Sequence, residues 1–392
     1  MVRFSRRVPT TRARALLAKI LIVALVVRLG AIVATGPGTL RFGDAQDYVD
    51  TAATLCDEGR YPDRGGLPFF RAPGLPFFLA ATTLCQPQRV VAAKLALAAC
   101  DVATTALVAL LTLLLFGDAA RRAALLAAAL AAIDPFLTLA ASDVTSEPLT
   151  TLLLTAALCA LVRARRDERS FAFAGLGGVA LGLAALTRPG ALAIAPAWLL
   201  LPAFTARRAA RQGGAVVLAA ALALAATLAP WTLRNWWHFG EPILVNDAGG
   251  YNAWRGTHPR LHEVLSETDP ARFAEASRTL EQDLERLARE QGLDVEASPG
   301  AREQRWWSAA RAGLAEDPAR SARILSRNAL AIFRPWLDPA AHGPVAVAAS
   351  AAWFVGLGGL ALFGATLLWR RDRRLAAILA AGVLLVGLAH MP

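Results

Sequence analysis

Charged residues are scarce in this chain: Asp, Glu, Lys and Arg make up only 18% of its 392 residues. A soluble domain of this size carries more charge, and its apolar residues fall in short periodic sets. Here 56% of the residues are hydrophobic, in blocks of about 17 to 25 residues that are long enough to cross a bilayer as helices. Because backbone groups in lipid must be paired within the segment, the sequence predicts an all-α polytopic membrane protein.

Cysteine and histidine are also scarce, with four and five residues. Neither shows the spacing of metal ligands. The sequence therefore identifies no certain cofactor, and a divalent cation stays an open alternative that ligand spacing does not support. Cys100 and Cys159 fall inside apolar blocks, where a thiol acts as a small apolar side chain. Cys56 and Cys85 share one predicted external loop, where they form either a disulfide or two unrelated thiols.

The sequence has no internal repeat, low-complexity linker or dense basic patch. Transporters tend to show two similar halves, so the missing repeat disfavours a membrane transporter or lipid flippase, although this alternative stays open. The net charge of +11 is spread over many loops and is not gathered in a groove with aromatic residues. No nucleic acid partner is therefore expected.

The apolar blocks predict about nine transmembrane helices. Arginine clusters precede the first block and follow the second, fourth, sixth and eighth. The positive-inside rule makes that side cytoplasmic, as for an inner-membrane protein with a cytoplasmic N-terminus, and the first block is a retained anchor. The predicted spans are 16–35, 88–116, 121–141, 146–162, 170–187, 189–204, 213–231, 344–369 and 374–390.

This topology divides the chain into three parts. A transmembrane core, 1–231, includes a first extracytoplasmic loop at 36–87 with two short surface helices. A larger extracytoplasmic helical region follows at 232–343, and its prolines at 270, 299 and 318 predict helix starts. Transmembrane helices at 344–392 complete the chain.

Six short motifs occur in a fixed order between residues 15 and 260. They are Gly-Asp-x-x-x-Tyr at 43–48, Arg-x-Pro-Gly-x-Pro at 71–76, Ser-Glu at 146–147, Leu-Thr-Arg-Pro at 186–189, Pro-Trp-x-x-Arg-Asn at 230–235 and Gly-Gly-x-Asn at 249–252. This set resembles the GT-C integral membrane glycosyltransferases. Within them it looks most like glycosyltransferase family 39, the dolichyl-phosphate-mannose–protein mannosyltransferase-like proteins, and it is also similar to the aminoarabinose transferases that modify lipid A.

The resemblance implies an enzyme that moves a sugar, with inversion, from a polyprenyl-phosphate carrier to an extracytoplasmic acceptor. The expected partners are this lipid-linked donor, the membrane lipids, and a protein, lipid or cell-envelope glycan as acceptor. A lipid phosphate is a good leaving group that needs cations to stabilise its charge, whereas the acceptor needs a base. A non-catalytic relative is a further alternative.

Asp44 is the expected base, because it lies just beyond the first span. An N-cap or a solvated loop acid is the other interpretation. Many members of the family have a second acid directly after this one, but Ala45 stands there in this chain. Asp47 lies about one helical turn further along, so the sequence favours a site with a single carboxylate.

Arg71, Arg188 and Arg234 are the expected phosphate contacts. For Arg71, a contact with the acceptor or a structural hydrogen bond to loop carbonyls is the alternative. Arg71 lies in a stiff Pro-Gly-Pro frame, and Arg188 lies at a helix junction between apolar residues, where an unpaired arginine is costly. The partner of Arg188 is then a substrate phosphate or a protein acid. The resemblance adds further expected substrate contacts at Tyr48, Asn235 and Asn252.

Two pairs of charged residues complete the candidate site. Asp143 and Glu147 are four residues apart, so a helix would place them on one face. They would orient the acceptor, ligate an ion or pair with Arg188 or Arg71, and pairing is favoured. Lys94 and Asp101 lie within the second span; Lys94 is expected to reach the carrier phosphate, and Asp101 to bond between helices.

Overall fold

The computed structural model describes residues 10–41, 43–63, 69–165, 170–203, 210–267, 269–293, 297–332, 334, 337 and 343–389. Within these ranges every regular element is helical, which confirms the all-α prediction. The arginine cluster before the first apolar block, which helps to predict the cytoplasmic side, includes Arg3, Arg6 and Arg7. These three residues lie outside the described ranges.

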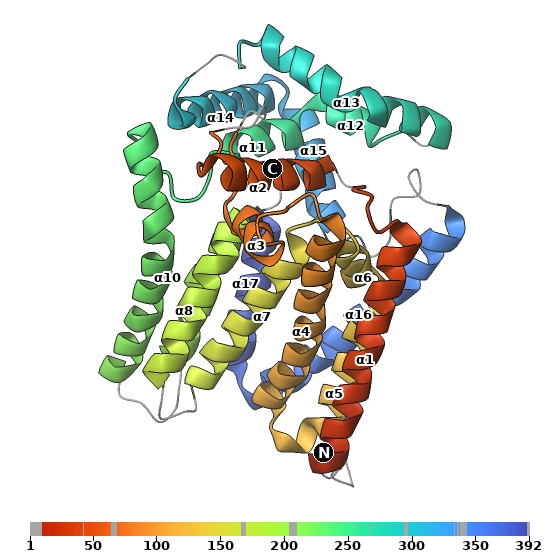
Figure 1. Cartoon of the computed structure of the whole chain (residues 1–392), viewed down its shortest axis with the longest axis vertical. Helices are drawn as coiled ribbons and strands as arrows, with labels where there is room; N and C mark the ends of the chain where they lie inside the picture. The colour runs from red at the N-terminus through yellow and green to blue at the C-terminus, as the bar shows by residue number, and fades with distance from the viewer. Residues whose placement is uncertain are drawn as a thin grey trace. The chain divides into compact units, whose positions relative to one another are not determined.

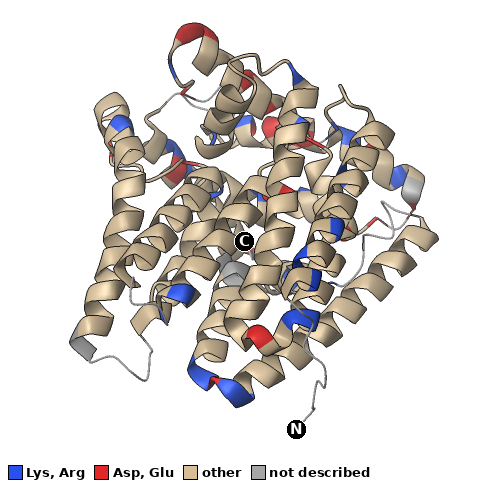
Figure 2. Ribbon diagram, turned by 60° about the horizontal axis from the view of Figure 1, so that its bottom comes forward, with Lys and Arg blue, Asp and Glu red and all other residues tan. Residues whose placement is uncertain are grey.

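Six helices of the described chain are long and apolar enough to cross a membrane. A seventh span results if η1 (Asp118–Ala120) and α5 (Arg121–Ala132) count together with α6 (Pro135–Ala141), which is bent from them by 52°. Figure 2 shows long helices with charged residues mostly at their ends and in the loops. The chain is thus a multi-pass membrane protein, while the count of nine spans stays a prediction. The six are α1 (Thr10–Thr35), α4 (Val90–Phe116), α7 (Glu147–Ala164), α8 (Ser170–Thr187), α10 (Ala210–Phe239) and α16 (Pro344–Arg371).

Contacts divide the chain into two compact units. The first unit comprises Met1–Gly65 and Arg71–Leu233, and the second comprises Gly66–Phe70 and Arg234–Pro392. The last turns of α10 therefore belong to the second unit. The three-part division expected from the sequence stays a prediction.

A buried ion pair joins three helices of the first unit. Arg28 on α1 donates from Nε to Asp101 Oδ2 on α4 at 2.7 Å, and both side chains are almost fully buried. The same guanidinium donates to the carbonyls of Ala131 and Ala132 on α5. The prediction that Asp101 bonds between helices is confirmed. The helices α4, α7 and α8 continue this packing side by side (Figure 1).

The sixth predicted span is not one continuous helix. Residues 189–204 contain three short pieces, η2 (Pro189–Ala193), α9 (Ala195–Trp198) and η3 (Leu201–Ala203). Prolines at 189, 196 and 202 lack the N–H that a continuous helix needs, and apolar composition alone does not reveal this break. Ala203 lies against Gly213, near the start of α10. The broken segment therefore runs from the end of α8 to the first turns of α10.

The connection between α1 and α4, which the sequence predicts to be external, contains the two short helices expected there. They are α2 (Gly43–Glu58), which ends at Gly59 with φ +64°, and α3 (Gly74–Thr82). Cys56 and Cys85 form a disulfide with a Cα–Cα distance of 5.4 Å. The disulfide alternative is therefore the one that the structure shows, and it closes the loop that contains Arg71.

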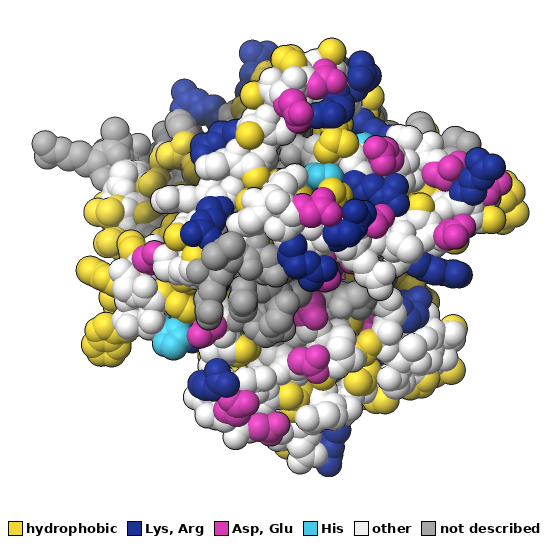
Figure 3. All heavy atoms as spheres, turned by 90° about the horizontal axis from the view of Figure 1, so that it is seen from above, with side chains coloured by type: hydrophobic (Ala, Val, Ile, Leu, Met, Phe, Trp, Pro, Cys, Tyr) yellow, Lys and Arg dark blue, Asp and Glu magenta, His cyan; other side chains and the backbone are white. Residues whose placement is uncertain are grey.

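The second unit holds a helical region whose core surrounds Trp254, Leu284 and Trp306. Three of its helices begin at the prolines that the sequence marks as starts, 270, 299 and 318, and Asp269 and Ser298 cap two of these helices. Figure 3 shows basic and acidic side chains interspersed on one face of the molecule. The helices of this region are α11 (Gly249–Thr257), α12 (Pro259–Val264), α13 (Pro270–Glu290), α14 (Pro299–Glu316) and α15 (Pro318–Ile332). The second unit also contains α16 and the helix that follows it, α17 (Arg373–Ala389).

Replacing Asp101 with Leu should destabilise the first unit by about 3–5 kcal/mol, because Arg28 then stays buried without its partner carboxylate. Thermal unfolding of the purified protein in detergent measures this loss. The matched control is Arg28→Met combined with Asp101→Leu, which removes both charges and should recover most of the stability. Equal unfolding temperatures for Asp101→Leu and the wild type would show that the pair does not hold these helices together.

Candidate functional site

The first turn and a half of α2 presents three functional side chains on one side. Asp44, Asp47 and Tyr48 stand at positions i, i+3 and i+4, which share a helix face. Ala45 and Val49 fall on the buried side and pack with Leu75 of α3. The position directly after Asp44 therefore points into the core, where a carboxylate would be costly.

Arg71 joins Asp44 and Asp47 of α2. Its Nη2 lies 2.8 Å from Asp44 Oδ1 and 2.5 Å from Asp47 Oδ2. The guanidinium carbon also lies 5.1 Å from the centroid of the Tyr48 ring, in a cation–π arrangement. Asp47 thus meets Asp44 at one arginine, although the residue beside Asp44 is alanine. That a single carboxylate acts as the base stays a prediction.

The turn that contains Arg71 touches the end of α8. A Cβ added to Gly74 would lie 2.5 Å from Thr187 Oγ1 and 2.7 Å from Thr187 Cα. Only glycine allows this approach. Because Thr187 directly precedes Arg188, the glycine of the Pro-Gly-Pro frame brings the two segments that contain Arg71 and Arg188 together.

Arg188 forms an ion pair with Glu147, whose carboxylate Oε1 lies 2.5 Å from Arg188 Nη1. Their side chains are 43% and 48% exposed, so solvent and ligands can reach this pair. The pairing that the sequence favours for Glu147 is confirmed. Ser146, the residue before Glu147, lowers the pKa of the Tyr48 phenol, so the segment that contains Glu147 lies near Tyr48 and the ion pairs of Arg71.

Tyr48 lies between the two ion pairs and is almost fully buried. Burial raises the pKa of the phenol, and the nearby carboxylates of Asp44 and Glu147 act in the same direction, against the opposing effects of Arg71 and Ser146. Tyr48 therefore keeps its proton near neutral pH and acts as a neutral hydrogen-bonding group.

Asp143 does not share a helix face with Glu147. It lies in the irregular connection before α7, which begins only at Glu147, because the proline at 148 suits a first helical turn. Its carboxylate accepts the backbone N–H of Arg41 at 2.8 Å and lies 3.9 Å from Lys94 Nζ. The helical spacing assumed from the sequence is thus wrong here.

Lys94 is held by the backbone of the segment that leads to α2. Its Nζ donates to the carbonyls of Gly36 at 3.0 Å and Thr39 at 2.6 Å. The side chains of Lys94 and Asp143 are both fully buried. The two side chains fix residues 36–41, and through this segment the start of α2. Contacts of Lys94 or Asp143 with substrate stay predictions, which the burial of both side chains does not support.

Three expected site residues belong to the second unit. Asn235 is buried and donates to the carbonyl of Ile243 at 2.9 Å, while Arg234 lies 5.3 Å from the Phe239 ring centroid. Asn252 is exposed on α11. A Cβ on Gly250 would lie 2.4 Å from the carbonyl oxygen of Glu303, so the glycines of that motif allow α11 to pack on α14.

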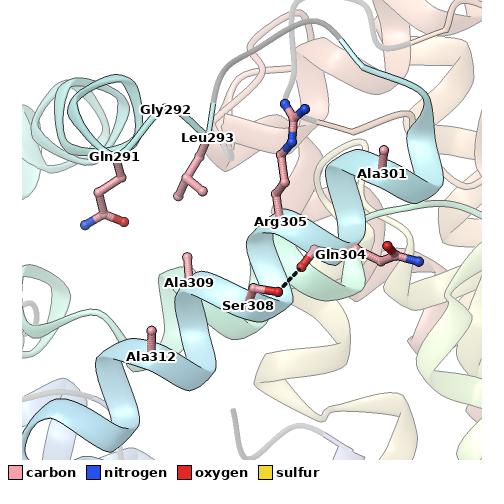
Figure 4. Close-up of a pocket in the computed structure, with 9 residues that line it drawn as sticks. All are labelled: Gln291, Gly292, Leu293, Ala301, Gln304, Arg305, Ser308, Ala309 and Ala312. Carbon is pink, nitrogen blue, oxygen red and sulfur yellow. Dashed lines mark hydrogen bonds between the residues drawn. The ribbon is translucent and has the colours of Figure 1, made fainter.

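The described residues contain no group of three or more His, Cys, Asp or Glu side chains that could hold a metal ion. A pocket of about 580 Å³ lies in the second unit, between the end of α13 and α14 (Figure 4). None of the expected site residues lines it. Its lining consists of Gln291, Gly292, Leu293, Ala301, Gln304, Arg305, Ser308, Ala309 and Ala312.

Comparison with known proteins confirms the resemblance that the motifs suggest. The model of the family described as dolichyl-phosphate-mannose-protein mannosyltransferase matches residues 70–232, which is less than half of the chain. The matched segment includes Arg71, Glu147 and Arg188 but begins after Asp44. No curated protein matches the chain significantly.

The fold is similar to that of a solved structure, the archaeal oligosaccharyltransferase AglB from Archaeoglobus fulgidus in complex with an inhibitory peptide and a dolichol-phosphate. The TM-score is 0.51 at 14% identity, over 95% of this chain and 50% of that one. An Archaeoglobus fulgidus oligosaccharyltransferase in complex with Zn and sulfate matches with a TM-score of 0.38, at 13% identity over 95% and 53% of the two chains. The chain thus spans about half the length of the structures it matches. The family match covers residues 70–232, and the similarity at 14% identity shows a shared fold.

Gly74→Ala should separate the Arg71 turn from the end of α8, because the added Cβ would clash with the backbone of Thr187. The expected cost is about 1–3 kcal/mol, read as a lower unfolding temperature in detergent. The matched control is Gly38→Ala, since a Cβ at Gly38 meets nothing within 4 Å. The same unfolding temperature for both variants would contradict the close approach.

Proposed function

We propose that this chain is an inverting glycosyltransferase of the inner membrane. It moves a sugar from a polyprenyl-phosphate carrier to an extracytoplasmic protein, lipid or cell-envelope glycan. The observation that carries the proposal is the cluster in the first unit: Arg71 pairs with the accessible carboxylate of Asp44, and Arg188 pairs with Glu147 where α8 ends and α7 begins, two helices long enough to cross a membrane.

The arginines supply the charge that the leaving group requires. As the bond between the sugar and the phosphate oxygen breaks, negative charge develops on the lipid phosphate, and guanidinium groups match its geometry. Arg188 is 43% exposed and can contact the phosphate directly. Arg71 is 12% exposed and is the second proposed phosphate contact. Arg234, Asn235 and Asn252 are further proposed contacts from the second unit.

Asp44 is the proposed base. Its side chain is 67% exposed, and Arg71 binds only its Oδ1 in the described contacts. The carboxylate takes the proton from the acceptor hydroxyl or amine, whose oxygen or nitrogen forms the new bond to the sugar. The phosphate leaves on the opposite face with the electron pair of the broken bond, so the configuration at the anomeric carbon inverts.

Asp44→Asn should lower sugar transfer by about 10²- to 10⁴-fold, because an amide cannot accept the acceptor proton. Transfer of a radiolabelled sugar from the polyprenyl-phosphate donor measures the effect. Asp57→Asn is the matched control, since Asp57 is exposed at the far end of the same helix, and it should transfer sugar as the wild type does. Wild-type transfer by Asp44→Asn would exclude Asp44 as the base.

A further inference from the structure

Tyr61 lies in the connection between α2 and α3 and is buried in an aromatic cluster of the first unit. Its ring meets the edge of Trp231 at 4.8 Å between centroids and stacks with Phe77 at 6.1 Å. Phe77 and Trp231 also contact each other at 6.3 Å. Trp231, the tryptophan of the Pro-Trp motif, thus packs against Tyr61 and fixes its position. The proposed reaction assigns no part to this contact.

The hydroxyl of Tyr61 bonds to the backbone of the Arg71 turn. It donates to the carbonyl of Arg71 at 2.9 Å, and the carbonyl of Ala72 lies at 3.3 Å. Prolines at 73 and 76 lack N–H groups, so the turn has few backbone donors of its own. A buried carbonyl requires a partner, and a side chain from outside the turn supplies it here.

We propose that Tyr61 is a positioning residue for the binding of the carrier phosphate, acting through Arg71. This inference rests on the proposed function. The hydrogen bond fixes the peptide plane that follows Arg71, and this plane sets the direction in which the Arg71 side chain leaves the backbone. With the turn fixed, one guanidinium reaches Asp44 and Asp47 and covers Tyr48. Without the hydroxyl, the turn rotates more freely and the guanidinium is held less firmly.

The test uses Tyr61→Phe, which removes only the hydroxyl and keeps the aromatic packing. The probe is farnesyl phosphate, a short prenyl monophosphate, and its affinity for the full chain in lipid nanodiscs is measured by titration. The affinity should fall about 3- to 10-fold, as for the loss of one net hydrogen bond. The matched control is Thr82→Val, which removes a hydroxyl that bonds a carbonyl on α3 and should leave the affinity unchanged.

A double-variant cycle separates positioning from a general loss of stability. In an Arg71→Gln background, which should itself bind the probe at least 10-fold more weakly, Tyr61→Phe should cause no further loss. The inference is overturned if Tyr61→Phe binds like the wild type while Arg71→Gln is impaired, or if Tyr61→Phe weakens binding equally in both backgrounds. Wild-type affinity in Arg71→Gln would overturn the phosphate role of Arg71 and the inference together.

Discussion

One arginine holds the candidate site together. Arg71 binds Asp44 and Asp47 at the start of α2, and the same guanidinium covers Tyr48. Such an arrangement needs a rigid turn, because a long side chain loses entropy when it is fixed in one geometry. The turn is stiffened by its prolines and touches Thr187 through Gly74. The rest of the site follows from this turn, since Thr187 leads directly to Arg188 and its partner Glu147.

The charges buried in the first unit are paired with each other and with backbone carbonyls. Arg28 with Asp101, and Lys94 with Asp143, have almost no exposed side-chain surface, and backbone carbonyls complete the donor contacts of both cations. An ion inside an apolar medium is tolerated only when it is paired and hydrogen-bonded. The charges of the site, in contrast, lie at helix ends, where Asp44, Glu147 and Arg188 stay accessible.

The sequence predicts local features well. Apolar blocks mark the membrane helices, and the prolines at 270, 299 and 318 mark helix starts, because both signals act within a few residues. Contacts between segments that are far apart in the sequence are harder to predict. The sequence does not show that Ala45 faces the core, or that Asp44 and Asp47 bind the same arginine. Arg28 was missed as the partner of Asp101 for the same reason, since it depends on which helix faces meet.

The central claim is that this chain consumes a lipid-linked sugar. The most direct measurement incubates the purified full chain in nanodiscs with a panel of labelled polyprenyl-phosphate sugars and an extract of membrane acceptors, and follows the release of free polyprenyl phosphate. We expect one donor to release its polyprenyl phosphate while its labelled sugar appears on an acceptor with the opposite configuration at the anomeric carbon. Release from none of the donors, or a product with retained configuration, would contradict it.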